Sequence, residues 1–271
     1  MNKLVSVIIP NYNSFLYIED TINSVLNQSY ENIEIIVVDD FSSDDSVKLV
    51  SKISQNHKNI KIIRLESNFG RPAGPRNIGL DCAQGDFIAF LDSDDIWHHQ
   101  KIEIQLKKMK EEDIAFSSTD IEHFKNKESL KNFDKIYDTN KIFVKKRKLN
   151  DLLIKNFIIS GSSVLCKREI IKDTKFNEDE LYKAVEDYQF WLDLHKDENF
   201  ESIFIPEKLV YYRHSESSIS KDKLNQAKKV YNLLNNYRNN GLGLGFKKYL
   251  YFTTYIFLSI KSLLIRKVRK I

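Results

Sequence analysis

Short runs of apolar, mostly β-branched residues alternate with segments of helical periodicity through the first 120 positions. Four runs predict strands: Val5 to Ile9, Ile33 to Val38, Ile60 to Leu65 and Phe87 to Leu91. Apolar residues three or four positions apart predict helices between them, over about 15–26, 47–53, 77–83 and 102–109. The runs are predominantly apolar and do not alternate regularly between polar and apolar residues, so both faces of their sheet must be covered. This pattern predicts an α/β fold with a mostly parallel sheet flanked by helices.

The pattern is less regular after position 120. Residues 120–158 are rich in Lys and Asn and have weak periodicity, which indicates a variable connection between two parts of the fold. A strand near Ser162 to Cys166, a helix from about Val185 to His195, and strands near Ile203 and Leu209 to Tyr212 complete the predicted core. The core then covers residues 1–220, as two halves of 1–120 and 121–220, and a tail covers 221–271.

The formal net charge of +4 is unevenly distributed. From Lys221 onward, twelve Lys or Arg residues stand against one acid, Asp222, so the tail carries +11 and residues 1–220 carry −7. An acidic body argues against a nucleic-acid-binding protein, whereas basic residues interleaved with apolar ones suit an anionic membrane surface.

The stretch Tyr249 to Ile265 is almost entirely apolar or aromatic, with Lys261 inside it and basic residues on both sides. Seventeen residues interrupted by a lysine are marginal for crossing about 30 Å of hydrocarbon, which favours a helix lying in the membrane interface. The alternative is a C-terminal helix packed on the rest of the protein. Gly241, Gly243 and Gly245 predict a hinge before this segment.

Composition excludes several classes of protein. Eight Gly, four Pro and two Cys are too few for a collagen-like, low-complexity or disulfide-stapled chain. Cys82 and Cys166 are therefore expected to be buried or idle thiols. The apolar run from Leu4 to Ile9 is too short for a signal peptide, so we expect a cytoplasmic protein, peripheral on the inner face of the cell membrane.

Acidic residues follow two of the predicted strands. Asp92, Asp94 and Asp95 come directly after the fourth, and an Asp-x-Asp turn there supplies hard oxygen ligands for Mg²⁺ or Mn²⁺, which would suit a nucleotide diphosphate. The alternative is a solvated turn in which Asp94 or Asp95 caps the next helix. In open α/β sheets, ligands lie outside the carboxyl ends of the strands, which is where both acidic groups fall.

The second acidic pair is Asp39 and Asp40. Asp40 is suited to accept a hydrogen bond from a base or a ribose, and Pro10, Tyr12 and Asn13 after the first strand could wall a base pocket. Alternatively, Asp39 or Asp40 caps the following helix, for which Ser42 or Ser43 is the predicted cap.

A loop rich in Gly and Pro, from Asn68 to Asn77, follows the third strand. Gly70 and Gly74 allow the backbone to approach a ligand, and Arg71 and Arg76 are available for a phosphate or a base. Taken alone, these residues are far more typical of an ordinary turn than of a binding site.

Together these motifs resemble the inverting family 2 glycosyltransferases of the GT-A fold. The resemblance rests on segments 5–13, 37–46, 76–79 and 90–95, and extends to 161–166, Glu186–Asp187 and 212–220, which covers about residues 3 to 220. It implies transfer of a sugar from a nucleotide donor, usually linked to UDP, by a single displacement at the anomeric carbon. A lipid-linked oligosaccharide, of a surface polysaccharide or a lipid A-type core, is then the expected acceptor.

The resemblance also implies roles for individual residues. Asp187 matches the general base, with Glu186 beside it, and an acceptor hydroxyl needs such a base because it is a poor nucleophile. Asp94 matches the main metal ligand for Mn²⁺ or Mg²⁺, with Asp92 and His214 as further contacts. The expected nucleotide-sugar contacts are Pro10, Tyr12, Asn13, Asp40, Asn68, Arg76, Asp92 and Ser93.

Two features depart from the family pattern, Phe41 and the stiffer loop that contains Pro72 and Pro75, and two rival functions stay open. Phe41 stands where the family commonly has glycine, which narrows the base pocket or alters its turn. A sugar nucleotidyltransferase should carry a Gly-rich N-terminal phosphate loop, but residues 10–13 read Pro-Asn-Tyr-Asn. A non-catalytic carbohydrate- or partner-binding module derived from a transferase is disfavoured by intact Asp94, Asp187 and His214.

Overall fold

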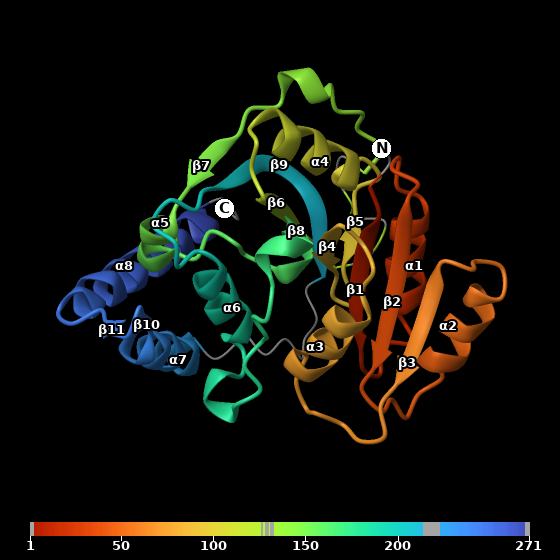
Figure 1. Ribbon diagram of the computed structural model, residues 1–271, viewed down its shortest axis with the longest axis horizontal. Helices are drawn as coiled ribbons and strands as arrows, with labels where there is room; N and C mark the ends of the chain where they lie inside the picture. Colours follow the sequence, from red (N-terminus) through yellow and green to blue (C-terminus); the bar gives the residue numbers. More distant parts are fainter. Residues whose placement is uncertain (1–2, 126, 128–129, 131–132, 214–222, 269–271) are drawn as a thin grey trace.

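The computed structural model of the chain describes residues 3–125, 127, 130, 133–213 and 223–268 (Figure 1). A nine-stranded sheet forms its centre. Eight strands follow the order β3-β2-β1-β4-β8-β6-β9-β5, and the ninth, β7, pairs with β9. The strands of this sheet are β1 (Val5–Asn11), β2 (Ile33–Asp39), β3 (Ile60–Arg64), β4 (Phe87–Phe90), β5 (Ile96–Trp97), β6 (Phe116–Phe124), β7 (Lys145–Arg147), β8 (Leu165–Lys167) and β9 (Ser202–Arg213).

The first four strands form the parallel part of the sheet, as predicted. β1 lies between β2 and β4, and β3 adds beyond β2. The register sets Asn11 opposite Asp39 at the carboxyl ends of β1 and β2. This brings the residues after β1, β2 and β4 to one edge of the sheet.

The second half of the sheet is mixed. β8 runs antiparallel to both β4 and β6, whereas β6 and β9 are parallel, with an irregular register around Asp120. Residues 120–124, which the sequence assigned to a variable connection, form the end of β6. The two strands predicted near Ile203 and over Leu209 to Tyr212 are one strand, β9, because its bulged pairing with β6 continues across the polar residues between them.

Eight helices of the described region flank the sheet or extend from it: α1 (Ile18–Leu26), α2 (Ser46–Ser54), α3 (Ala73–Cys82), α4 (Lys101–Glu111), α5 (Leu149–Ile154), α6 (Glu186–Leu194), α7 (Lys223–Asn236) and α8 (Lys247–Val268). Residues of α1, α2 and α4 pack with Val5, Val7 and Ile9 on one face of the sheet. Residues of α3, α6 and α7 pack with Ile8 on the other. Coverage of both faces explains why these strands are predominantly apolar.

Helix α3 approaches the sheet closely because of Gly79. A Cβ atom at this position would lie 2.4 Å from Cγ2 of Ile8, which is fully buried. Helix α3 also begins four residues earlier than the helix predicted near 77–83. Pro75 does not prevent this, because a residue in the first turn of a helix needs no intrahelical N–H partner.

Two further helix starts differ from the prediction. Helix α1 begins at Ile18, and Phe15 lies before it with an exposed side chain. Helix α2 has Asp45 at its N-cap position, so Ser42, Ser43, Asp39 and Asp40 do not cap it. The hydroxyl of Ser42 is engaged with Asp39 instead.

The C-terminal region is continuous with the core. Val230, Leu233 and Leu234 of α7 are buried in the same cluster as α6. The predicted glycine hinge includes a small hairpin of β10 (Arg238–Asn239) and β11 (Leu242–Gly243), in which Gly241 has a φ of +79°. No helix in the described part of the chain is long and apolar enough to cross a membrane.

Candidate active site

A buried hydrogen-bond cluster joins the carboxyl ends of β1 and β2. The Asn11 amide donates to Asp39 at 2.6 Å and to Ser46 at 3.1 Å, and the Ser42 backbone N–H donates to Asp39 at 3.1 Å. Asp39 is fully buried and saturated by these donors. Of the two predicted acids, Asp39 therefore holds the turn together and does not face a ligand.

Asp40 faces a hollow beside the end of β1. We call it the β1 hollow; its volume is about 420 Å³, and it is lined by Pro10, Tyr12, Asn13, Asp40, Ser93 and other residues. The Phe69 backbone N–H donates to the Asp40 carboxylate at 2.7 Å, and the Asn68 amide donates to the Asp40 carbonyl at 2.9 Å. Burial raises the pKa of Asp40. Asn68, predicted to contact the nucleotide, hydrogen-bonds the backbone of Asp40 and is not among the residues that line the hollow.

Phe41 follows Asp40 with a φ of +60°, in the left-handed region that favours glycine. Its ring is half exposed, and the Arg64 guanidinium lies 6.0 Å from the ring centre. The backbone therefore keeps the conformation of a glycine turn, and the aromatic side chain is not among those that line the β1 hollow.

The acidic turn after β4 is held in place by Asp95. This fully buried carboxylate accepts hydrogen bonds from the Ser162 hydroxyl at 2.6 Å and from the Arg213 backbone N–H at 3.1 Å. The Asp92 backbone N–H donates to the same hydroxyl at 3.0 Å. Helix α4 begins at Lys101, so neither Asp94 nor Asp95 caps it. Asp95 thus positions the turn.

Asp92 and Asp94 are the two acids of this turn that reach open space. Burial and, next, the nearby Asp92 carboxylate raise the pKa of Asp94 to about 6. A divalent cation between them would offset both effects, so this pair fits a magnesium or manganese ion. The described residues contain no group of three or more metal-ligating side chains, and the predicted third ligand, His214, lies outside them.

The first turn of α6 supplies the predicted base. Asp187 is partly exposed, and its carboxylate accepts a hydrogen bond from the Tyr188 backbone N–H at 2.6 Å. Burial and the adjacent Glu186 raise the pKa of Asp187 to about 7, although the Arg76 guanidinium opposes the shift. A carboxylate with this pKa can both accept and release a proton near neutral pH.

Arg76 joins the acidic turn to α6. Its buried guanidinium lies 2.6 Å from Asp92 and 3.9 Å from Glu186, with the Phe176 ring 5.4 Å away. Glu186 is itself buried. Arg76 was predicted to contact the nucleotide sugar. In the structure its guanidinium pairs with carboxylates on both sides of the site.

Two hollows meet at these residues. A second hollow of about 420 Å³, which we call the α6 hollow, contains Glu186 and Asp187. It shares Arg71, Pro72, Arg76, Asp92 and Asp94 with the β1 hollow. The shared carboxylates and arginines therefore stand between a hollow with Asp40 and a hollow with Asp187, an arrangement suited to two substrates.

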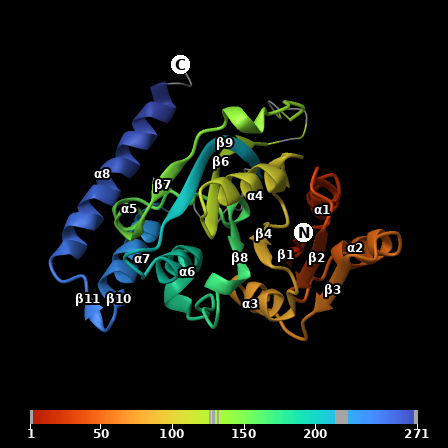
Figure 2. The ribbon, with the colours of Figure 1, turned by 45° about the horizontal axis from the view of Figure 1, so that its top comes forward.

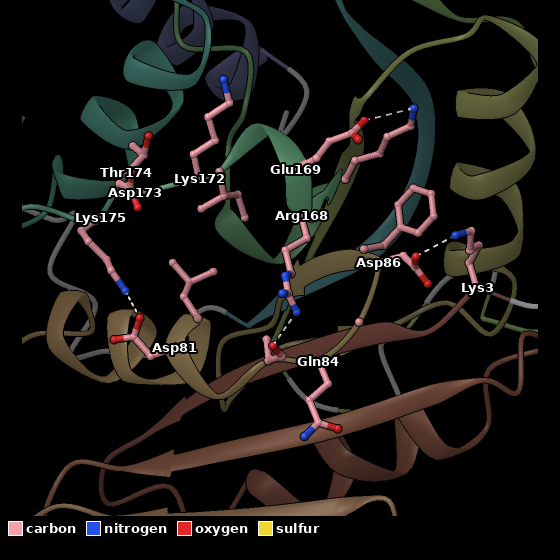
Figure 3. A pocket seen from close by; sticks show the side chains of 16 residues that line it. Lys3, Asp81, Gln84, Asp86, Arg168, Glu169, Lys172, Asp173, Thr174 and Lys175 are labelled. Atoms are coloured by element: carbon pink, nitrogen blue, oxygen red, sulfur yellow. Dashed lines mark hydrogen bonds and ion pairs between the residues drawn. The ribbon is translucent and has the colours of Figure 1, made fainter.

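A larger hollow, of about 920 Å³, lies elsewhere, around the start of β4 and the end of β8 (Figure 3). Its charged side chains are mostly paired with one another. Lys3 binds Asp86 at 2.7 Å, Lys175 contacts Asp81, and Lys167 lies 3.5 Å from Glu169. The acids of the sheet edge are absent from its lining, so size does not identify the active site here.

Two residues that hold the site were not among the predicted site residues. Ser162 connects Asp92 to Asp95, as described above. The Arg213 guanidinium donates to the Asp94 carbonyl at 2.9 Å and lies between the rings of Tyr17 and Phe124, at 4.6 and 4.4 Å. Both belong to segments already noted for their resemblance, so that resemblance was the available signal.

Comparison with known proteins identifies the family. The Glycosyl transferase family 2 model matches residues 6–175. The chain is 36% identical, over 96% of its length and 94% of the relative's, to the Escherichia coli UDP-Glc:alpha-D-GlcNAc-diphosphoundecaprenol beta-1,3-glucosyltransferase WfgD. It also resembles S. aureus TarS in complex with UDP, with a TM-score of 0.65 and 24% identity, over 88% of this chain and 67% of that one.

A second solved structure is similar in fold, the mannosyltransferase PcManGT from Pyrobaculum calidifontis in complex with GDP-Man and Mn²⁺. The TM-score is 0.63 and the identity 18%, over 86% of this chain and 63% of that one. The predicted GT-A-type α/β fold is thus confirmed. The sugar nucleotidyltransferase alternative is set aside, because the chain belongs to glycosyl transferase family 2 and is a glycosyltransferase.

Proposed function

We propose that this protein transfers a hexose, with inversion, from a UDP-sugar to a saccharide linked through diphosphate to a lipid. The relative that covers 96% of the chain is named for UDP-Glc and a diphosphoundecaprenol acceptor, which favours UDP-glucose as the donor. The observation that carries the proposal is the junction of the β1 hollow and the α6 hollow at Asp92, Asp94 and Arg76.

The donor fits the β1 hollow. Asp40 would accept a hydrogen bond from the N–H of the uracil ring, with Pro10, Tyr12 and Asn13 around the base and ribose. Arg71 and Arg76 bring positive charge to the junction, where the diphosphate would lie. A donor in this position directs its anomeric carbon toward the α6 hollow.

The acceptor fits the α6 hollow, where Asp187 is the proposed base. As an acceptor hydroxyl attacks the anomeric carbon, its proton passes to the Asp187 carboxylate, and the bond from that carbon to the diphosphate breaks. The nucleoside diphosphate leaves with the electron pair of that bond. One displacement inverts the anomeric configuration, and Arg76 helps to keep Asp187 ionised because its positive charge opposes the rise in pKa.

Asp94 and Asp92 would hold a Mn²⁺ or Mg²⁺ ion, with His214 proposed as a further ligand. When bound, the ion supplies positive charge that stabilises the leaving diphosphate. Asp95, Ser162 and Arg213 keep the two carboxylates in place through the hydrogen bonds described above. This rigid support is what a preorganised metal site needs.

The test is a transfer assay with purified protein, Mn²⁺ and GlcNAc-diphospholipid as acceptor. With UDP-glucose we expect a product heavier by one hexose in mass spectrometry, and with GDP-mannose or no metal we expect little product. A β linkage from the α-linked donor, read by NMR, would show inversion. If no UDP-hexose is transferred or hydrolysed by folded protein, the proposed donor class and reaction are wrong.

We further propose that α8 lies on the cytoplasmic membrane surface. The side chains of Phe246, directly before α8, and of Leu250 and Phe257 within it are 64% to 90% exposed, and Lys247 and Lys248 stand at the start of the helix. Apolar and basic groups together favour binding to anionic lipid. Such binding would bring a lipid-linked acceptor close to the α6 hollow.

Replacing Phe246, Leu250 and Phe257 together by Ser should weaken binding to vesicles of phosphatidylglycerol at least about tenfold, because each large side chain contributes on the order of 1 kcal/mol when partly buried. Sedimentation with vesicles measures the effect, and phosphatidylcholine vesicles control for charge. Unchanged binding of the triple variant would rule out this surface.

A further inference from the structure

Helix α8 is fixed on the protein by specific contacts of its first turns. The Lys248 amine donates to Asn235 of α7 at 2.6 Å, and the Tyr251 hydroxyl donates to Asn150 of α5 at 3.2 Å. The ring of Phe252 lies 5.2 Å from that of Tyr231. Helices α7 and α8 lie on the side of α6 away from α3 and β4 (Figures 1 and 2).

These contacts bring Tyr255 into the α6 hollow that contains Asp187. Tyr255 is partly buried and packs against the main core. Tyr188, the residue after Asp187, is buried in that core and also lines the hollow, and burial followed by the nearby Tyr255 phenol raises the pKa of Tyr188. The C-terminal helix therefore reaches the immediate surroundings of the base.

Carboxylates and apolar side chains both line the α6 hollow. The acidic turn and the start of α6 provide four carboxylates, from Asp92, Asp94, Glu186 and Asp187. Ile159, Val230 and Tyr255 provide apolar surface from other segments. A sugar ring has hydroxyl groups around its edge and C–H groups on its faces, so this combination matches a saccharide. Aromatic side chains supply broad apolar contact at small entropic cost.

We propose that Tyr255 forms the wall on which the acceptor sugar packs, which makes the C-terminal helix part of the acceptor site as well as a membrane contact. The inference rests on the proposed transfer reaction, because it places the acceptor in the α6 hollow. It assigns different functions to two aromatic residues of one helix: Tyr255 contacts the sugar, and the exposed Phe257 contacts the lipid surface.

The experiment uses full-length protein and a GlcNAc diphosphate with a short, water-soluble alkyl chain, in the absence of membranes. Tyr255→Ala should raise the KM for this acceptor about tenfold, with the KM for UDP-glucose and the rate of UDP-glucose hydrolysis unchanged. Tyr255→Phe should remain close to wild type, because the ring supplies the contact. Phe257→Ala, the matched control, should keep the acceptor KM and lose affinity for phosphatidylglycerol vesicles.

Calorimetric binding of the same acceptor separates failure of this inference from failure of the proposed function. If wild-type protein binds the acceptor but does not transfer glucose, the glucosyl donor is wrong, and the inference holds if Tyr255→Ala weakens binding. If Tyr255→Ala binds and uses the acceptor as wild type does, the inference is overturned. Absence of acceptor binding by wild-type protein would also overturn it.

Discussion

Replacing Asp187 by Asn is expected to lower kcat for sugar transfer by about 1,000-fold, because the amide keeps the shape of the side chain but cannot accept the acceptor proton. The affinity for UDP should stay unchanged, since Asp187 does not line the β1 hollow. Initial rates and UDP titrations measure the two effects. Asp193→Asn, in the same helix α6 and outside both hollows that form the site, is the matched control.

The same base predicts the pH dependence of the reaction. The pKa of Asp187 is raised to about 7, and only the ionised carboxylate can take the proton. The value of kcat/KM should therefore rise about tenfold per pH unit below pH 7 and level off above it. A profile that is flat from pH 5.5 to 8, or an Asp187→Asn variant with more than a tenth of wild-type activity, would remove Asp187 from this role.

Replacing Asp94 by Asn should have opposite effects on the protein with and without ligand. At 100 times its dissociation constant, UDP with Mn²⁺ should stabilise the wild type by about 2.7 kcal/mol and raise Tm by about 5 to 10 °C. We expect the variant to lose most of this shift, because it lacks one carboxylate ligand. Thermal unfolding with UDP, GDP and CMP, each with and without Mn²⁺, provides the measurement.

With a chelator present and no ligand, Asp94→Asn should melt slightly above the wild type at pH 7. The folded-state pKa of Asp94 is raised to about 6, so folding disfavours its ionised form, and this loss of stability is present above pH 6 and disappears as pH falls below 4. The neutral amide removes it. A variant that is less stable without ligand and still responds fully to UDP with Mn²⁺ would contradict a metal-binding role for Asp94.

The apolar runs in the sequence were sufficient to predict the first four strands and the helices between them. A strand covered on both faces is predominantly apolar, and β1 and β2 are buried along most of their length. The carboxyl ends of such strands meet at one edge, so the sequence also indicated that Asp40, Asp92 and Asp94 would lie near each other. The strands of the second half were harder to predict, because the bulge of β9 interrupts its periodicity.

Roles within the acidic groups depended on tertiary contacts. Five aspartates stand at or shortly after the ends of β2 and β4, and residue type alone does not distinguish them. Asp39 and Asp95 are fully buried and accept hydrogen bonds from distant segments. The donors to Asp95 come from Ser162 and Arg213, which are 67 and 118 positions away. Hydrogen bonds over such separations leave no local pattern. The family resemblance pointed to Asp40, Asp92 and Asp94, and the structure gave the physical reason why Asp39 and Asp95 support the site.

By itself, the sequence determined the α/β architecture, the edge of the sheet where chemistry occurs, and the residue types available there, because hydrophobic periodicity and strand-end motifs are local properties. The tertiary structure decided which carboxylates face open space, that Arg76 serves both sides of the site, and that Tyr255 reaches the hollow of Asp187. These outcomes depend on packing between segments as distant as α3, α6 and α8, whose relative positions no local pattern encodes.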